Sequence, residues 1–450
     1  MPQVRPLRPI AYAPARFARS PIPDRIRLPD DADGIPAAGH SVSDLTDVAC
    51  PPYDVIDGDL QRALLDRDPH NAIRLELPPD AEPHRAAAEA LQGWLADGTL
   101  QRRRDASVYY YAHATTDDPD EPTVQGVLAR VLLEPYGAEV RAHEHTMPGP
   151  KADRLEHLRA TGSQLSPILA IYLDRSERYR HVMSRAWGDE WRARDEDGLL
   201  HTLAEVEPDD RLLGYLSRQR LYIADGHHRY ETALAYQAEV RADPAAAGAA
   251  PGELAADWIM IVLVNAEMEE LQVLPTHRLL RGVDPGALER LAGGAQEPWG
   301  SVAMADDELG ATLRSADANG RVAFGLLLPD GRAFELSTER DAIGERMRSE
   351  RISSAVAGLD VAVLHAAILQ DVLAVGTAHV AAGDRLAYTR SATEARGAVE
   401  SGEAQAAILV RPTGLDQLQA VAGAGDVMPQ KSTYFYPKLL TGMAFYSLED

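Results

Sequence analysis

The chain has 450 residues, 45% of them hydrophobic and 25% charged, which is the composition of an ordinary globular protein with room for two or three domains. Acidic residues outnumber basic ones by 69 to 45 and give a formal net charge of −24, which argues against a nucleic-acid partner, because phosphate-backbone binding draws on clustered lysine and arginine. Cys50 is the single cysteine, so an internal disulfide and a cysteine-based metal cluster are excluded. Since no stretch approaches about 18 uninterrupted apolar residues and the N-terminus lacks the apolar segment of a secretory signal, we expect a cytoplasmic protein without a membrane span.

We expect residues 1–100 to form an N-terminal region that packs on a core formed by later residues. Within this region, PPYDVI at 51–56 contains two prolines that fix the backbone, so Tyr53 and Asp54 are presented on a rigid turn. These two side chains are candidates for lining a site, although an ordinary proline-rich turn explains them equally well. The hydrophobic pattern predicts a helix over 84–97 and strands over 107–112 and 124–133.

A polar segment with the sequence His143-Glu144-His145 ends the next predicted strand. Alternate residues of a strand point to opposite faces, so the two histidines share one face and the glutamate takes the other. A zinc-binding helix would need its histidines four residues apart, so no zinc site is expected here and Glu144 alone is the functional candidate. Its alternative role is that of a surface carboxylate.

The residues that follow predict a helix over 151–160 and a strand over 167–172. Leu155 and Leu158 are expected to face inward on this helix. Lys151 and Arg154 lie on the same helix and are candidates for lining the site.

Residues 221–234, LYIADGHHRYETAL, combine a strand, a tight turn and a helix start. The apolar run at 221–224 predicts a short buried strand, Asp225-Gly226 predicts a turn, and a helical face of Tyr230, Ala233 and Leu234 follows. The unpaired N–H groups of a first helical turn favour anions, and a glycine at the turn allows close backbone approach. The junction therefore predicts a phosphate-binding site.

The side chains of this junction suit such a ligand. His227, His228 and Arg229 follow Gly226 directly, and the planar guanidinium of Arg229 is expected to contact phosphate or carboxylate and not the core. The alternative interpretation is a solvated helix start capped by Asp225.

Further along the chain, apolar residues predict strands over 257–266 and 271–280, and the second carries His277, a candidate for lining the site. Residues 281–450 alternate predicted helices and strands, which indicates an α/β region. Near the C-terminus, MPQKSTYFYPKLLTG is expected to be loop-like, with Lys431 and Lys438 on either side of three aromatic residues. Two lysines around aromatic rings suit an anionic ligand, so the segment either packs over the site or anchors the tail.

Six blocks of this sequence, in order, resemble the family called domain of unknown function 1015, from about residue 50 to the C-terminus. The blocks are PPYDVI, HNAIRLELP, HEHTMPGPKADRLEHLRATG, YIADGHHRYETAL, PTHRLL and STYFYPKLLTG. That family is in turn similar to the ParB/sulfiredoxin superfamily, whose members share a Gly-x-x-Arg signature after a strand. The resemblance implies a mixed α/β (α+β) fold, with a ParB/sulfiredoxin-like core over 101–280 that contains the DGHHR motif and an additional α/β C-terminal region over 281–450.

Three branches of that superfamily imply different chemistry. Sulfiredoxins use a catalytic cysteine in Gly-Gly-Cys-His-Arg, but His227 stands at that position, so the thiolate nucleophile is missing and this chemistry is rejected. ParB proteins carry Gly-Glu-Arg-Arg and bind CTP and DNA. The corresponding residues 226–229 are less basic here and the chain is acidic, so nucleotide binding stays open while DNA binding is not expected.

Free serine kinases, which phosphorylate the hydroxyl of L-serine to give O-phosphoserine, resemble the chain best, because their Asp-Gly-His-His-Arg is reproduced at 225–229. The resemblance implies an ADP- or ATP-dependent kinase of free L-serine or a similar hydroxy amino acid. Glu144 would be the general base, residues 226–229 would hold the nucleotide phosphates, and Asp225 would bind Mg²⁺ or orient the nucleophile. Glu144 and Asp225 are 81 residues apart, farther than in those compact enzymes, which implies an insertion. The alternative is a non-catalytic, ParB-like nucleotide-binding regulator in which Glu144 is structural.

Overall fold

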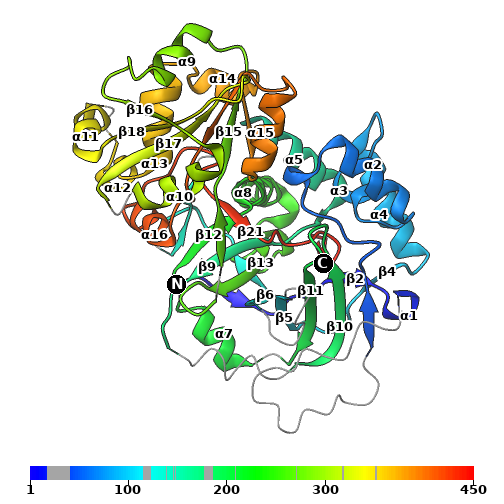
Figure 1. Cartoon of the computed structure of the whole chain (residues 1–450). Coiled ribbons are helices and arrows are strands. Elements are labelled where there is room, and N and C mark those ends of the chain that lie inside the picture. The colour runs from blue at the N-terminus through cyan, green and yellow to red at the C-terminus, as the bar shows by residue number, and fades with distance from the viewer. Residues whose placement is uncertain are drawn as a thin grey trace, which may run out of the picture. The chain divides into compact units, whose positions relative to one another are not determined.

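The computed structural model describes residues 1–17, 41–114, 123–137, 139–144, 146, 148–176, 186–207, 209–269, 271–316, 319–349 and 352–449. Contacts between α-carbons divide the chain into two compact units (Figure 1). The first unit comprises Met1–Ala142, Thr146–Leu271 and Pro437–Asp450, and the second comprises His143–His145 and Gln272–Tyr436. The expected division into an N-terminal region at 1–100, a core at 101–280 and a C-terminal region at 281–450 stays a prediction.

The first unit is built on a mixed sheet of ten strands in the described residues. Nine of its strands lie in the order β3-β10-β11-β5-β6-β13-β9-β12-β7. The tenth, β1, pairs antiparallel with β6. The strands of the sheet are β1 (Val4–Arg5), β3 (Val42–Asp44), β5 (Val108–Ala114), β6 (Val124–Leu132), β7 (Val140–Arg141), β9 (Ile168–Tyr172), β10 (Ala186–Arg194), β11 (Leu200–Val206), β12 (Leu221–Asp225) and β13 (Trp258–Asn265). The short pairs β2 (Ile10–Tyr12) with β4 (Leu100–Arg102) and β8 (Ser163–Gln164) with β22 (Tyr446–Ser447) complete its strands.

Strand β13 lies inside this sheet, antiparallel to β6 and parallel to β9. All eight of its residues are buried, which explains why the sequence here is a continuous apolar run and not an alternating one. Strand β12 pairs antiparallel with β9, so β9 alone separates the strand that leads into the DGHHR junction from β13.

Two helices of the first unit, α5 (Pro148–Thr161) and α8 (His227–Ala242), frame the site described below. Helix α8 buries Tyr230 and Ala233 in the apolar core that contains Ile168, Ile223 and Ile261, as its helical pattern predicts. Helix α5 packs on α8, and α4 packs on α5. The helices are α1 (Pro14–Phe17), the 3₁₀ turn η1 (Tyr53–Val55), α2 (Gly58–Arg67), α3 (Ile73–Glu76), α4 (Pro83–Ala96), α5 (Pro148–Thr161), α7 (Asp210–Leu216), α8 (His227–Ala242), η3 (Pro244–Ala246) and η4 (Ala255–Asp257).

The described residues of the second unit contain an antiparallel sheet of six strands in the order β16-β18-β17-β20-β15-β19. These are β15 (His277–Leu280), β16 (Gly300–Met304), β17 (Arg321–Leu327), β18 (Ala333–Glu339), β19 (Leu386–Thr389) and β20 (Ala406–Leu409), with a separate pair β14 (Gln272–Leu274) and β21 (Tyr434–Tyr436). Its helices are α9 (Pro285–Ala292), α10 (Asp306–Ala316), α11 (Arg340–Ser349), α12 (Ser354–Ala357), α13 (Asp360–Val363), the π-helix η6 (Leu364–Gln370), α14 (Thr377–Ala382), α15 (Ala392–Glu400) and α16 (Leu415–Gly423). Leucines of α10 and alanines of α15 pack against this sheet and form its apolar core.

The mixed α/β class is confirmed, as are the predicted helices at 84–97 and 151–160 and the predicted strands at 107–112, 124–133 and 167–172. Three expectations were wrong. The strand expected to end at His143-Glu144-His145 is β7, which already ends at Arg141, and Glu144 makes only an isolated bridge with Met428. The apolar run at 271–280 forms two strands, β14 and β15, because Pro275 between them has no N–H to donate to a ladder. The segment at 428–442 is not only loop, since Tyr434–Tyr436 forms β21 and pairs with β14. The ParB/sulfiredoxin label stays a prediction.

Across the described ranges, none of the helices has the length and apolar character needed to cross a membrane.

Candidate functional site

The DGHHR residues occupy the junction that the sequence predicts: strand β12 ends at Asp225, Gly226 caps the helix, and α8 begins at His227. Gly226 adopts a left-handed conformation, with φ 89° and ψ 28°. A Cβ atom at this position would lie 2.6 Å from Cγ2 of Ile168 on the neighbouring strand. Only glycine combines this backbone conformation with such close approach of strand β9.

Replacing Gly226 with alanine is expected to destabilise the protein by about 2–4 kcal/mol, which combines left-handed strain with forced displacement of Ile168. Gly248 offers a matched control, because its φ is 90° but nothing lies within 4 Å of its Cβ position. Gly248→Ala should cost only the backbone strain, about 1–2 kcal/mol. Denaturant unfolding of both variants measures the difference. Equal losses would show that the contact with Ile168 contributes nothing.

The Asp225 carboxylate lies between two cations. One of its oxygens accepts a hydrogen bond from Nζ of Lys438, and the other accepts from Nη2 of Arg229 at 2.8 Å. The three side chains are largely buried, with exposed fractions of 15% for Asp225, 10% for Lys438 and 13% for Arg229. Burial raises the pKa of Asp225, but the charges of Lys438 and Arg229 outweigh it, so the net pKa lies well below its ordinary value.

Arg229 is also tied to the protein itself, since its Nη1 donates to the carbonyl of Pro167 at 2.7 Å. The expectation that this guanidinium serves a ligand and not the protein is therefore wrong in part: it holds the end of β12 to the start of β9. Its role toward phosphate stays a prediction.

These contacts also bear on the expected magnesium site. Both oxygens of Asp225 are paired with cations, and no group of three or more acidic, histidine or cysteine residues suitable for a metal occurs in the described part of the chain. Asp225 in this arrangement does not fit as a direct Mg²⁺ ligand.

His227 and His228 are the first two residues of α8. His227 is buried, with 8% of its surface exposed, and His228 is half-buried. Both lie in the first helical turn, where the N–H groups have no acceptor within the helix. Their binding of phosphate stays a prediction.

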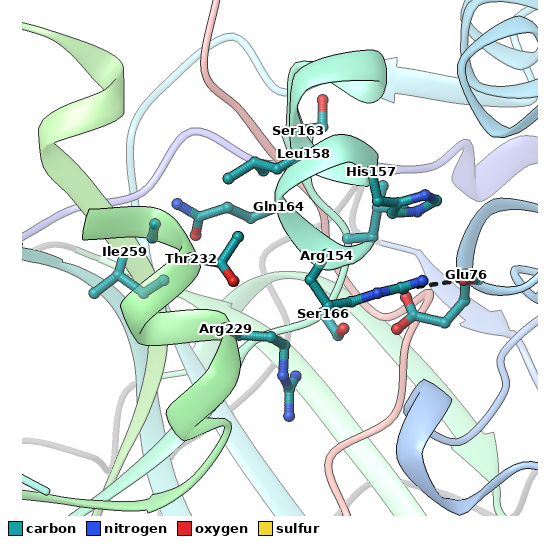
Figure 2. A pocket seen from close by; sticks show the side chains of 12 residues that line it. Glu76, Arg154, His157, Leu158, Ser163, Gln164, Ser166, Arg229, Thr232 and Ile259 are labelled. Carbon is teal, nitrogen blue, oxygen red and sulfur yellow. Dashed lines mark hydrogen bonds between the residues drawn. The ribbon is translucent and has the colours of Figure 1, made fainter. Parts of the chain in front are cut away.

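A cavity of about 50 Å³ lies between α5 and α8 in the first unit (Figure 2). Its charged lining residues come from three elements: Glu76 ends α3, Arg154 lies on α5, and Arg229 lies on α8. The remaining lining residues are His157, Leu158, Ser163, Gln164, Leu165, Ser166, Thr232, Ala233 and Ile259.

Glu76 is the functional candidate that the sequence analysis missed. It is 3% exposed, and its Oε1 accepts a hydrogen bond from the Tyr53 amide at 3.4 Å. Burial raises the pKa of Glu76 above its ordinary value, and the nearby Arg154 and Arg229 partly oppose this shift. Its signal in the sequence is an acid directly between two leucines, Leu75 and Leu77.

Two of the residues expected to line a site do meet here. The guanidinium of Arg154 lies 4.6 Å from the centre of the Tyr53 ring, and its Nη1 donates to the carbonyl of Glu76 at 3.3 Å. Asp54 beside them is exposed, and Lys151 pairs with Glu231 at 2.8 Å.

Three other candidates belong to the second unit: Glu144, His277 and Lys431. Oε2 of Glu144 accepts the Ser432 amide at 3.2 Å. Nδ1 of His277 accepts the Val410 amide at 3.2 Å, and burial lowers the pKa of His277 to about 4, so this side chain is a neutral acceptor. The carbonyl of Lys431 accepts a hydrogen bond from the buried Arg278 at 3.3 Å. His145 of the HEH pattern lies outside the described residues.

Solved structures similar to this chain include three proteins, each 12% identical to it. A free serine kinase in complex with AMP has a TM-score of 0.34, with 72% of this chain and 86% of that chain covered. A conserved hypothetical protein from Pyrococcus furiosus has a TM-score of 0.35, with coverages of 73% and 92%. SbnI with a C-terminal truncation, from Staphylococcus aureus, has a TM-score of 0.34, with coverages of 68% and 83%. Likenesses of this extent establish neither the fold nor the activity of this chain.

No curated protein matches the sequence. A family model does match, over residues 35–362, and its description is a protein of unknown function, DUF1015. The match includes the PPYDVI turn, the Glu76 helix, the HEH segment and the DGHHR junction. The chain therefore belongs to the DUF1015 family of proteins of unknown function.

Proposed function

We propose that this protein is a nucleotide-dependent kinase that transfers a phosphoryl group from ADP or ATP to the hydroxyl of free L-serine or a similar hydroxy amino acid. The observation that carries the proposal is the junction of β12 and α8, where DGHHR is fixed by a left-handed glycine and a buried ion-pair network. A protein catalyses phosphoryl transfer mainly by positioning the two reactants and by neutralising the negative charge of the phosphoryl group. The sequence resemblance to free serine kinases at residues 225–229 supports the same activity.

The start of α8 supplies the phosphate cradle in this proposal. The first-turn N–H groups and the positive end of the helix dipole favour an anion, and His227 and His228 stand at this end. Two of the five N–H donors of Arg229 are engaged by Asp225 and Pro167, so its guanidinium is held in one position from which it contributes positive charge.

The reaction is an in-line displacement. The serine hydroxyl oxygen forms a new bond to the terminal phosphorus while the bond from that phosphorus to the bridging oxygen breaks, and the electron pair leaves with the nucleotide. The hydroxyl proton goes to the carboxylate of Glu144, which acts as general base. Asp225 stays ionised between Lys438 and Arg229 and keeps the cradle in place. Mg²⁺ would be carried by the nucleotide phosphates and not by Asp225.

A non-catalytic nucleotide-binding regulator is the second candidate. One observation favours it: Glu144 accepts a backbone hydrogen bond from Ser432, which is a structural role for a carboxylate. The two candidates share nucleotide binding and differ in whether a phosphorylated product forms.

Incubation of the full chain with ADP or ATP, Mg²⁺ and L-serine, followed by mass analysis for phosphoserine, separates the two candidates. We expect phosphoserine with one or both nucleotides and none when L-serine is omitted. Bound nucleotide without phosphoserine would contradict the kinase and support the regulator.

A further inference from the structure

The cavity between α5 and α8 is too small for a nucleotide. At about 10–15 Å³ for each water-sized group, its 50 Å³ hold about three to five such groups, which is the size of the amino, α-carbon and carboxylate unit of an amino acid or of a single phosphate. The occupant of this cavity is therefore a small molecule or a small part of one.

The charges around the cavity are nearly balanced. Arg154 and Arg229 are positive and Glu76 is negative, while each guanidinium also has a carboxylate partner, Asp153 for Arg154 at 2.6 Å and Asp225 for Arg229 at 2.8 Å. A dianion such as phosphate would meet the Glu76 carboxylate in a poorly solvated space, which disfavours it. A ligand that carries one positive and one negative group matches this lining.

Two polar groups of the cavity lack what a ligand would supply. Thr232 is 4% exposed and projects from α8 toward α5 (Figure 2), and its hydroxyl has no hydrogen-bond partner among the described residues. The Glu76 carboxylate is buried beside guanidinium groups yet accepts a single, long hydrogen bond from within the described residues. A buried carboxylate with so few hydrogen bonds is stabilised when a cationic group donates hydrogen bonds to it.

We propose that this cavity binds the α-amino and α-carboxylate groups of a small free amino acid, with Glu76 facing the ammonium group and the guanidinium groups of Arg154 and Arg229 facing the carboxylate. Ser166 and Thr232 supply hydroxyl groups for the remaining hydrogen bonds. The inference rests on the proposed function in one respect, namely that the amino acid held here is the acceptor of the phosphoryl group. Glu76 is then a substrate-binding residue that selects free amino acids over other alcohols.

Calorimetric titration of the full chain without nucleotide tests this site directly. L-Serine, L-alanine and glycine should bind, L-leucine should not fit, and inorganic phosphate should not compete. Glu76→Gln keeps the side-chain shape and removes the charge, so it should weaken L-alanine binding by about 10- to 100-fold, the range for a hydrogen bond to a charged group. Glu76→Asp keeps the charge and should retain part of the affinity.

Glu89→Gln is the matched control, because Glu89 is an exposed glutamate of α4 that pairs with Arg85 and does not line the cavity. It should bind L-alanine as the wild type does. The melting temperature of each variant shows whether it is folded. If Glu76→Gln does not fold, titration of the wild-type protein with the amino acids and phosphate named above still tests the site. Failure of L-alanine and glycine to bind would then overturn it.

The pH dependence of L-alanine affinity is an independent test of the site. Burial is the largest effect on the pKa of Glu76 and raises it, Arg154, Arg229 and the Tyr53 amide lower it, and Asp54 raises it, so the net shift is upward. The thiol of Cys50 and the hydroxyl of Tyr53 are further titratable groups that interact with Glu76. Binding of an ammonium group requires ionised Glu76, so affinity for L-alanine should rise with pH through the raised pKa of Glu76. This rise should be absent in Glu76→Asn and Glu76→Gln.

Failure of this site and failure of the kinase are distinguishable. L-Alanine binding that depends on Glu76, without phosphoserine formation, would retain the amino-acid site and reject the kinase. Phosphoserine formation with an unchanged KM for L-serine in Glu76→Gln would retain the kinase and overturn this site. Binding of phosphate that is strengthened by Glu76→Gln would also overturn it.

Discussion

Replacing Asp225 with alanine is expected to lower the free energy of unfolding by about 3–5 kcal/mol, the cost of removing one partner of a buried ion pair. The reason is that Lys438 and Arg229, both largely buried, would then face each other without the carboxylate between them. Denaturant unfolding near pH 7 measures the loss. Adding Lys438→Met to this variant removes one of the two cations, so the double variant should recover part of the lost free energy of unfolding.

An exposed ion pair of the same unit provides the control. Asp59 pairs with Arg62 on α2 with 88% of its side chain exposed, so Asp59→Ala should cost at most about 1 kcal/mol. A loss for Asp225→Ala as small as that for Asp59→Ala would contradict the buried network.

The same network predicts the direction of the pH dependence. Because the pKa of Asp225 is lower in the folded protein than in the unfolded chain, its contribution is complete above the unfolded value of about 4 and is lost as the pH falls toward the folded value. Between pH 7 and pH 3, the wild type should therefore lose more stability than Asp225→Ala.

Glu144→Gln is expected to reduce turnover by roughly 10²- to 10⁴-fold, the usual contribution of a general base. The affinity for nucleotide should change little, because glutamine keeps an oxygen that can accept the hydrogen bond from the Ser432 amide. Turnover of phosphoserine at saturating substrate measures the effect.

The matched control is Glu403→Gln, which alters an exposed glutamate of the same unit that pairs with Arg281. Its turnover should equal that of the wild type. If Glu144→Gln also turned over at the wild-type rate, Glu144 would be structural and another carboxylate, Glu76 or Asp54, would have to accept the proton.

The strand, turn and helix of residues 221–242 could be predicted because each rests on local signals. The apolar run at 221–224 predicts β12, and Asp225-Gly226 predicts the turn. The periodic apolar residues Tyr230 and Ala233 predict the buried face of α8. Residues 272–280 show where local hydrophobic patterns fail. Their apolar pattern predicts one strand, but Pro275 cannot donate a backbone hydrogen bond and divides the run into two strands.

The contacts that define the site could not be predicted, because they join residues far apart in the chain. Asp225 and Lys438 are 213 positions apart, and Arg154 and Glu76 are 78 positions apart. Hydrophobic periodicity shows which face of a helix is buried, but it does not show which other element supplies the partner. For this reason the sequence predicts a ligand contact for Arg229 but not its bond to the Pro167 carbonyl, and it does not mark Glu76 as a site residue.

Phosphorus NMR of the full chain with ADP or ATP, Mg²⁺ and L-serine tests the central proposal most directly, because it follows where the phosphoryl group goes. We expect the terminal phosphate signal of the nucleotide to decline while a phosphomonoester signal of O-phosphoserine grows in equal amount. This growth should require L-serine and should be strongly slowed in Glu144→Gln. A decline that yields only inorganic phosphate, or unchanged nucleotide in the presence of L-serine, would contradict it.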